Sequence, residues 1–179
     1  MSAQVLMPAV VLGIDTPIGL AIVRSLGRRG VPVYGVARSV AAPGLSSRYL
    51  REGIMRAEDA TGTLAQLEKL AQRLGSACLF AISEGDIALL NRHREQLTGY
   101  RLMFPDARRM DTVLDKQQTY AAAAVAGVPV PRTVQPAIFA EAVSAAPTLR
   151  YPVVLKWAEP NEAGILLRRA GLVLDKTRY

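Results

Sequence analysis

The chain has 179 residues and a net charge of +7, from 22 Lys and Arg against 15 Asp and Glu. This length can bury a hydrophobic core, and 50% of the residues are hydrophobic, as in ordinary globular α/β proteins. No apolar run approaches the ~20 residues that cross a bilayer, and we expect no signal peptide. The one cysteine, Cys78, excludes an internal disulfide and a cysteine-based zinc site. The composition therefore predicts a cytoplasmic protein with no membrane partner.

The positive charge is the one feature that suggests a polyanionic partner. A basic protein attracts nucleic acid, but it also attracts nucleotides and anionic metabolites. The arginines occur in scattered pairs such as Arg28-Arg29, and only 6% of the residues are aromatic. The stacking surface of a protein that binds single-stranded nucleic acid is therefore missing. We expect no nucleic-acid partner, and we interpret most of these pairs as solvated helix ends.

The first 36 residues have the pattern of a strand, a helix and a second strand. Residues 9–12 are a continuous apolar run that ends at Gly13, as expected of a strand buried on both faces of a parallel sheet. Thr16 and Pro17 then provide an N-cap and a first helical residue. Residues 31–36, rich in valine, read as the next strand. The three elements form a right-handed βαβ unit.

The same alternation continues along the first part of the chain. The pattern predicts a short strand at 51–56, a helix at 64–74, a strand at 77–82, a helix at 86–97 and a strand at 101–104. Repeated alternation of this kind is typical of a doubly wound parallel sheet. We therefore predict a Rossmann-like α/β domain.

The composition changes after Asp106. The pattern predicts an Ala-rich helix at 110–126, an extended segment at 132–135, a short helix at 137–145, a strand at 151–157 and an amphipathic helix near the end. We predict one domain over residues 1–107 and a second piece over 108–179, which is too short to close a core of its own.

The turn after the first predicted strand is a candidate ligand site. Gly13 permits a tight turn, and the following helix presents backbone N–H groups to an anion, to which Thr16 adds a hydroxyl. Widely spaced glycines stand in place of the G-x-G-x-x-G fingerprint of NAD(P)-binding proteins. A tight turn without ligand contact is the equal alternative.

Polar residues also follow two other predicted strands. Arg38 lies where a dinucleotide-binding enzyme places its ribose-reading residue, so it is a candidate for binding a phosphate or a carboxylate. The alternative is an exposed loop arginine. Glu84 and Asp86 are candidates for binding a substrate amine or orienting a hydroxyl, but Asp86 or Ser83 alternatively caps the following helix. The sequence identifies no catalytic residue and no metal ligand.

Two lysines form the most informative pattern. Lys116 follows Asp115 at the start of the Ala-rich helix, and Lys156 ends the apolar run Pro152-Val-Val-Leu. An apolar strand would hold the stem of Lys156 and leave its ammonium facing a ligand. The segment Gly127-Val-Pro-Val-Pro131 separates them. This arrangement favours neutralisation of a polyphosphate.

The segment Asp115-Lys116, Gly127-Val-Pro-Val-Pro131 and Tyr151-Pro-Val-Val-Leu-Lys156 resembles the entry into the ATP-grasp fold. That family includes biotin carboxylase, carbamoyl phosphate synthetase and many carboxylate–amine ligases, and residues 1–107 resemble its pre-ATP-grasp domain. The resemblance implies that Lys116 and Lys156 bind ATP phosphates bridged by Mg²⁺. It implies activation of a carboxylate as an acyl phosphate, which an amine then attacks. It also implies that Gly13, Thr16 and Glu84 contact the carboxylate or amine substrate.

The sequence departs from the family after the second lysine. In ATP-grasp enzymes the adenine hinge, the magnesium ligands and a catalytic arginine come from beyond that point, whereas this chain ends at Tyr179. We therefore expect an N-terminal fragment that is inactive alone, with a completing C-terminal segment or a homo-oligomer as partner. Two alternatives stay open: a Rossmann-like module that binds a small anionic metabolite, and an NADP-dependent oxidoreductase that uses Arg38 for the 2′-phosphate.

Overall fold

The computed structural model describes residues 6–150 and 153–154. The chain divides into two compact units, Met1–Leu114 and Asp115–Tyr179. These units are defined by their compactness, so the domain boundary predicted after residue 107 stays a prediction.

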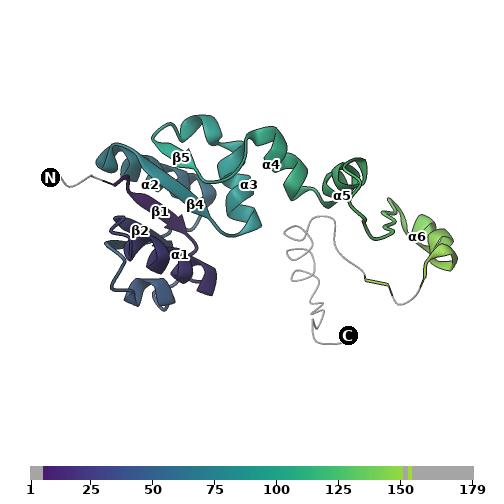
Figure 1. The fold of residues 1–179 in the computed structure, drawn as a ribbon, viewed down its shortest axis with the longest axis horizontal. Helices are drawn as coiled ribbons and strands as arrows, with labels where there is room; N and C mark the ends of the chain where they lie inside the picture. Colours follow the sequence, from purple (N-terminus) through teal and green to yellow (C-terminus); the bar gives the residue numbers. More distant parts are fainter. Residues whose placement is uncertain (1–5, 151–152, 155–179) are drawn as a thin grey trace. The chain divides into compact units, whose positions relative to one another are not determined.

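The first unit is a Rossmann-like α/β domain (Figure 1). Its elements are β1 (Ala9–Leu12), α1 (Pro17–Gly27), β2 (Val33–Ala37), the 3₁₀ turn η1 (Pro43–Ser46), β3 (Glu52–Met55), α2 (Ala60–Leu74), β4 (Ala77–Ala81), α3 (Glu84–Arg92), the 3₁₀ turn η2 (Arg94–Gln96), β5 (Tyr100–Leu102) and α4 (Ala107–Leu114). The five strands are parallel in the order β3-β2-β1-β4-β5. The predicted doubly wound parallel sheet is confirmed.

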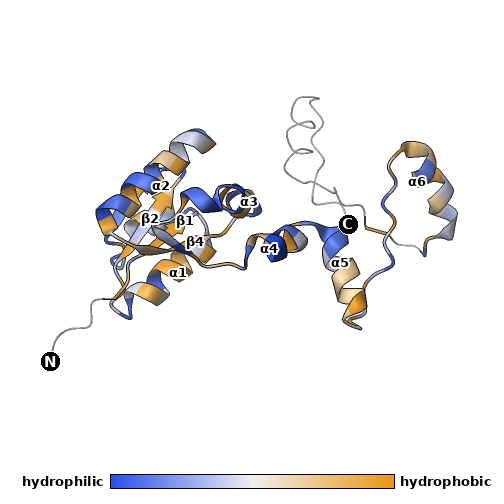
Figure 2. Ribbon diagram, turned by 90° about the horizontal axis from the view of Figure 1, so that it is seen from above, coloured by the Kyte–Doolittle hydropathy of each residue, from blue (hydrophilic) through white to orange (hydrophobic). Residues whose placement is uncertain are grey.

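The core lies on both faces of this sheet because β1 is buried along its whole length. Val10 and Leu12 pack on one face with α2 and α3, whereas Val11 packs on the other face with Val23 of α1. Figure 2 shows the apolar strands between α2 and α1. The continuous apolar run of β1 is thus explained by burial from two sides, as the sequence predicted.

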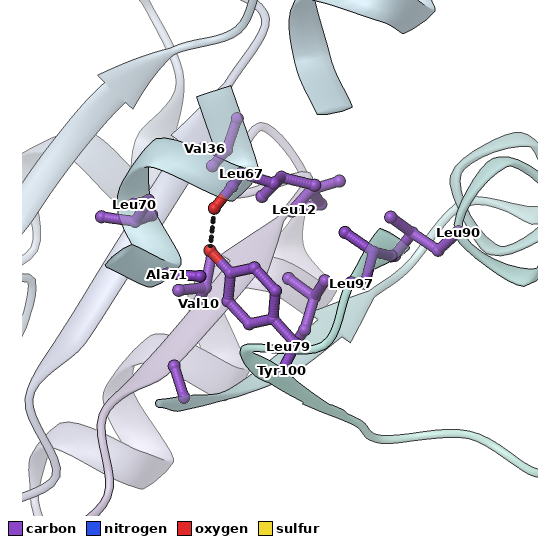
Figure 3. Close-up of a cluster of buried hydrophobic side chains, with 11 residues drawn as sticks. Val10, Leu12, Val36, Leu67, Leu70, Ala71, Leu79, Leu90, Leu97 and Tyr100 are labelled. Carbon is purple, nitrogen blue, oxygen red and sulfur yellow. Dashed lines mark hydrogen bonds between the residues drawn. The ribbon is translucent and has the colours of Figure 1, made fainter. Parts of the chain in front are cut away.

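Tyr100 closes the α2 side of the core (Figure 3). Its hydroxyl donates a hydrogen bond of 2.7 Å to the backbone oxygen of Leu67, in a buried environment. Burial of the ring raises the pKa of Tyr100, so the hydroxyl stays protonated and keeps donating at neutral pH. The bond joins β5, the outermost strand on one side of the sheet, to α2.

We expect Tyr100→Phe to lower the free energy of unfolding by about 1–2 kcal/mol, since a buried hydrogen bond is lost while the ring remains. Urea unfolding of the chain measures the change. Tyr34→Phe is the matched control, because within the described residues the Tyr34 hydroxyl has no hydrogen bond and its ring contacts Arg73 instead. Equal losses in the two variants would show that the Tyr100 bond is not responsible.

Two predicted helices have different limits in the structure. The helix predicted at 86–97 begins at Glu84, because Ser83 Oγ accepts a hydrogen bond from the Asp86 N–H, and it ends at Arg92, where His93 leaves the helical conformation. The helix predicted at 110–126 is divided into α4 and α5 (Lys116–Val125). Asp115 is extended, and its carboxylate accepts hydrogen bonds from the N–H groups of the next helix. In both cases a local N-cap, Ser83 for α3 and Asp115 for α5, sets the residue at which the helix begins.

The second unit contains α5, α6 (Phe139–Ala145) and the 3₁₀ turn η3 (Ala146–Thr148). Gly127, with φ of 73°, ends α5 in a left-handed turn. None of the described residues from 115 onward is buried. The predicted extended segment at 132–135 has no regular secondary structure. The strand predicted at 151–157, apart from residues 153–154, lies outside the described residues, as does the final helix.

Within the part of the chain that the structure describes, no helix has both the length and the apolar character needed to cross a membrane.

Candidate functional site

The candidate site is the edge of the sheet where the parallel strands end. Gly13 follows β1, Arg38 follows β2, and Ser83 follows β4. Since β1 lies between β2 and β4, these three residues belong to neighbouring loops at one edge. The chain winds to opposite sides from β1 and β4, and this reversal is where open α/β sheets place ligands. The fold therefore brings Gly13, Thr16, Arg38 and Glu84 to one edge of the sheet, and their contact with a ligand stays a prediction.

The turn after β1 is held by its own hydrogen bonds. Gly13 adopts φ of 94°, a conformation that favours glycine. The Thr16 hydroxyl donates to the Gly13 oxygen at 3.0 Å and accepts from the Gly19 N–H at 3.1 Å. It thus caps α1, as predicted. The alternative of a tight, self-contained turn accounts for these bonds, and ligand contact by Gly13 and Thr16 stays a prediction.

Asp15 joins the turn after β1 to the loop after β2. Its carboxylate accepts hydrogen bonds from the backbone N–H groups of Arg38 and Ser39, both at 2.9 Å. A further bond of 3.0 Å joins the Gly44 N–H to the oxygen of Ile14. The backbone at Arg38 is therefore fixed against the end of β1. No local pattern in the sequence indicates this role of Asp15, because its partners are 23 and 24 residues away.

A buried carboxylate joins side chains that follow β2, β3 and β4. The Asp86 side chain is only 2% exposed, and Arg38 Nη2 donates to its two oxygens at 3.0 and 3.2 Å. Arg56, which follows β3, forms a second ion pair with Asp86 through Nη1. Arg56 Nε also donates to Thr63 Oγ1 at 3.1 Å, and Thr63 is buried in α2. Four elements of the domain meet in this network.

The network carries more positive than negative charge. Asp86 is one carboxylate against two guanidiniums, and the Arg56 side chain is 14% exposed whereas that of Arg38 is 57% exposed. The inner pair of Arg56 and Asp86 balances itself, so the surplus charge lies at Arg38, next to solvent. Exposed Glu84 begins α3, two residues before Asp86. The edge thus presents one cation and one carboxylate, which suit a substrate that carries charge.

The sequence offered Ser83 and Asp86 as alternative caps of α3, and the structure also adds residues to the site. Ser83 is the N-cap, and the Asp86 carboxylate is used for ion pairs. Arg56 and Thr63 were not predicted as site residues. Arg56 follows its strand directly, as Arg38 does, so the same rule applied to β3 would have found it.

Only one of the two lysines lies in the described residues. Lys116 is the first residue of α5 and is half-buried. Asp115 before it accepts hydrogen bonds from the N–H groups of Gln117 and Gln118, and the Gln118 N–H is the largest cause of a lowered Asp115 pKa. Lys156 lies outside the described residues, so the pairing of the two lysines stays a prediction.

No family model and no curated protein matches the sequence. Solved structures do match. The biotin carboxylase domain of the Hydrogenobacter thermophilus 2-oxoglutarate carboxylase, in complex with MgADP and bicarbonate, has a TM-score of 0.64 at 16% identity, over 86% of this chain and 35% of that one. N5-carboxyaminoimidazole synthetase from Staphylococcus aureus, complexed with ADP, has a TM-score of 0.63 at 16% identity, over 93% and 46%. The chain has the fold of the N-terminal part of ATP-grasp enzymes.

A third match supports the same fold. The biotin carboxylase domain of a single-chain bacterial carboxylase has a TM-score of 0.58 at 18% identity and covers 91% of this chain. The chain spans less than half the length of these three proteins, with 35% to 46% of each covered. The resemblance to the ATP-grasp family that the two-lysine segment predicted is confirmed for the fold.

Proposed function

We propose that the chain is the N-terminal part of an ATP-dependent carboxylate–amine ligase of the ATP-grasp type, which acts through an acyl phosphate. The observation that carries the proposal is the fold similarity, which covers 86% to 93% of the chain and therefore includes residues beyond the Rossmann-like domain. Two of these structures hold bound ADP. The free thiol of Cys78 suits the reducing cytoplasm, which we infer as the location.

The start of α5 suits a phosphate group. A lysine at the first position of a helix opposes the helix dipole, so helix stability does not explain Lys116. Free backbone N–H groups and an ammonium together bind anions well. We assign Lys116, together with Lys156, to the ATP phosphates. Among the described residues no three His, Cys, Asp or Glu side chains gather as metal ligands, so we assign none of them to Mg²⁺.

The carboxyl edge of the sheet suits the second substrate. Arg38 offers an exposed cation, Glu84 an exposed carboxylate, and Gly13 and Thr16 form the turn between them. In the proposed ligase these residues bind and orient the carboxylate or the amine. ATP supplies the phosphoryl group that activates the carboxylate, with Mg²⁺ offsetting its charge.

Replacement of Lys116 by Ala tests the assignment. In the longest protein that the coding frame encodes, we expect Lys116→Ala to lower kcat/KM for ATP by about 10- to 100-fold, because one charge-assisted hydrogen bond contributes about 1.5–3 kcal/mol. Formation of ADP, measured with a panel of carboxylates and amines, gives the rate. Lys69→Ala, which removes an exposed lysine of α2, is the matched control. Unchanged turnover in the Lys116 variant would contradict the phosphate role.

A metabolite-binding module without chemistry is the second candidate, favoured by the exposed Arg38 at the carboxyl edge. A thermal-shift series on the 179-residue chain separates the two. Stabilisation by small anionic metabolites, with none by ATP or ADP in magnesium, favours the module. For the NADP-dependent alternative, a fluorescence titration with NADPH should show saturable binding that Arg38→Gln weakens.

A further inference from the structure

Six arginines lie in a segment of the sequence that contains no acidic residue. This segment runs from Thr16 to Arg51. Arg38 belongs to the carboxyl edge described above. The other five are exposed, and we call them the arginine surface: Arg24, Arg28, Arg29, Arg48 and Arg51.

Tyr49 joins the two segments that carry the arginine surface. The guanidinium carbon of Arg48 lies 4.9 Å from the centre of the Tyr49 ring, and that of Arg28 lies 5.9 Å from it. Arg48 Nη2 also donates to the Tyr49 hydroxyl at 2.8 Å. Arg24 is one helical turn before Arg28 and therefore shares its face of α1. The Arg51 N–H donates to the oxygen of Val33, where β2 begins.

The packing at this corner is built into the backbone. A Cβ at Gly27, the last residue of α1, would lie 2.5 Å from Tyr49 Cβ and 2.8 Å from the Tyr49 oxygen. Only glycine lets the helix end approach Tyr49 so closely. The arginines of the helix and of the segment before β3 are thus held near one another by a fixed contact.

Within the described residues, none of these five arginines forms an ion pair. The ion pairs in that part of the chain involve Arg38, Arg56, Arg73 and Arg109. The whole chain has a net charge of only +7, so most of its surplus is concentrated here. Most protein surfaces intersperse charges of both signs, and a large field of one sign serves to steer or bind a partner.

The arginine surface is separate from the candidate ligand site. The helix α1 starts beside the carboxyl end of β1 and runs back, so its end lies with the amino ends of β2 and β3. The substrate site is at the opposite edge of the sheet. The arginine surface therefore does not contact the substrate, and the molecule that binds it is a different one.

We propose that the arginine surface docks an acidic segment of a partner protein. Guanidiniums match carboxylates with paired hydrogen bonds, and all five cations are arginines rather than lysines. Two of them are already held by Tyr49, so less side-chain entropy is lost when they bind. A protein that binds single strands needs free aromatic faces for bases. Here Arg28 and Arg48 lie over the ring of Tyr49, which disfavours a single-stranded nucleic acid.

A labelled peptide of ten glutamates tests the proposal. Fluorescence anisotropy of the full 179-residue chain at low salt should give saturable binding, which weakens as salt rises because charges are screened. We expect Arg28→Gln with Arg48→Gln to raise the Kd at least about tenfold, which corresponds to 1.4 kcal/mol. The matched control is Arg101→Gln with Arg108→Gln, two exposed arginines of β5 and α4 that remove the same charge. The control should raise the Kd less than about twofold.

Three outcomes would overturn the proposal. The first is the absence of binding by the unsubstituted chain. The second is an equal loss in both double variants, which would assign binding to net charge alone. The third is tighter binding of a single-stranded RNA of equal charge that depends on Arg28 and Arg48, which would favour nucleic acid. Thermal unfolding of each variant confirms that the fold is kept, and none of these results depends on the ligase activity.

Discussion

Asp86→Asn should lower the free energy of unfolding by about 3–5 kcal/mol, the range for breaking a buried ion pair by removing one partner. The substitution keeps the shape of the side chain but leaves the guanidinium of Arg56, whose side chain is 14% exposed, without its counter-ion. Arg38 contributes less, since its side chain is 57% exposed and water solvates it. Urea unfolding followed by far-ultraviolet circular dichroism measures the loss.

Glu52→Gln is the matched control for Asp86. It breaks the ion pair with Arg73, in which the two side chains are 38% and 53% exposed. Surface pairs of this kind contribute about 0.2–1 kcal/mol. A loss in the Asp86 variant no larger than in the Glu52 variant would mean that the network adds little to stability.

A double variant separates the charge from the packing. Arg56→Met with Asp86→Leu removes both charges together and fills the space with apolar groups, which is often neutral or stabilising for a buried pair. We expect it to recover most of the stability lost in Asp86→Asn. Arg38 then lacks its partner, so any ligand that binds the double variant as well as the natural chain does not depend on the position of Arg38.

The sequence predicted the sheet because its signals are local. Each of the strands β1, β2 and β4 has a short apolar run that ends at a turn residue, and the Thr16 cap marks the start of α1. The break at Asp115 was missed, since an aspartate within a helical pattern reads equally as a helix residue or a cap. The extended backbone of Asp115 shows that it is the N-cap of α5.

The site was only half predictable for a different reason. Arg38, Glu84 and the Gly13 turn were found from their place after strands. The ion pairs of Asp86 join residues 48 and 30 positions apart, and no periodicity encodes such contacts. The arginine surface was not predictable for the same reason, because Arg28-Arg29 and Arg48 are far apart in the sequence. Folding around Tyr49 brings them together.

The two edges of the sheet have different electrostatic designs. At the carboxyl edge, positive groups are paired with Asp86, and Asp15 binds backbone N–H groups, so that side chains are held in place. At the amino edge the arginines have no such partner in the described residues. Held side chains suit a small ligand that must be oriented, whereas unpaired exposed charges suit an extended partner.

Gly19→Ala is the second substitution with a large expected effect, and it reports on the turn at the candidate site. Gly19 is buried in the first turn of α1, where a Cβ would lie 2.4 Å from the oxygen of Gly13 and 2.7 Å from Cα of Ile14. Both contacts are with backbone, so the helix or the turn must move. Strain of this kind costs about 1–3 kcal/mol or more, and the better helix propensity of Ala returns about 1 kcal/mol. We expect a net loss of about 2 kcal/mol.

Gly85→Ala is the matched control, because Gly85 is exposed in the first turn of α3 and the substitution gains the helix propensity of Ala. We expect it to leave the free energy of unfolding unchanged or raise it by about 0.5–1 kcal/mol. The Gly19 substitution should also weaken the binding of any ligand that stabilises the natural chain in the thermal-shift series. The reason is that the Thr16 hydroxyl caps the same turn. A Gly19 variant as stable as the Gly85 variant would show that the turn can change its conformation at no cost in the free energy of unfolding. Such a turn would not hold Gly13 and Thr16 in a fixed position against a substrate.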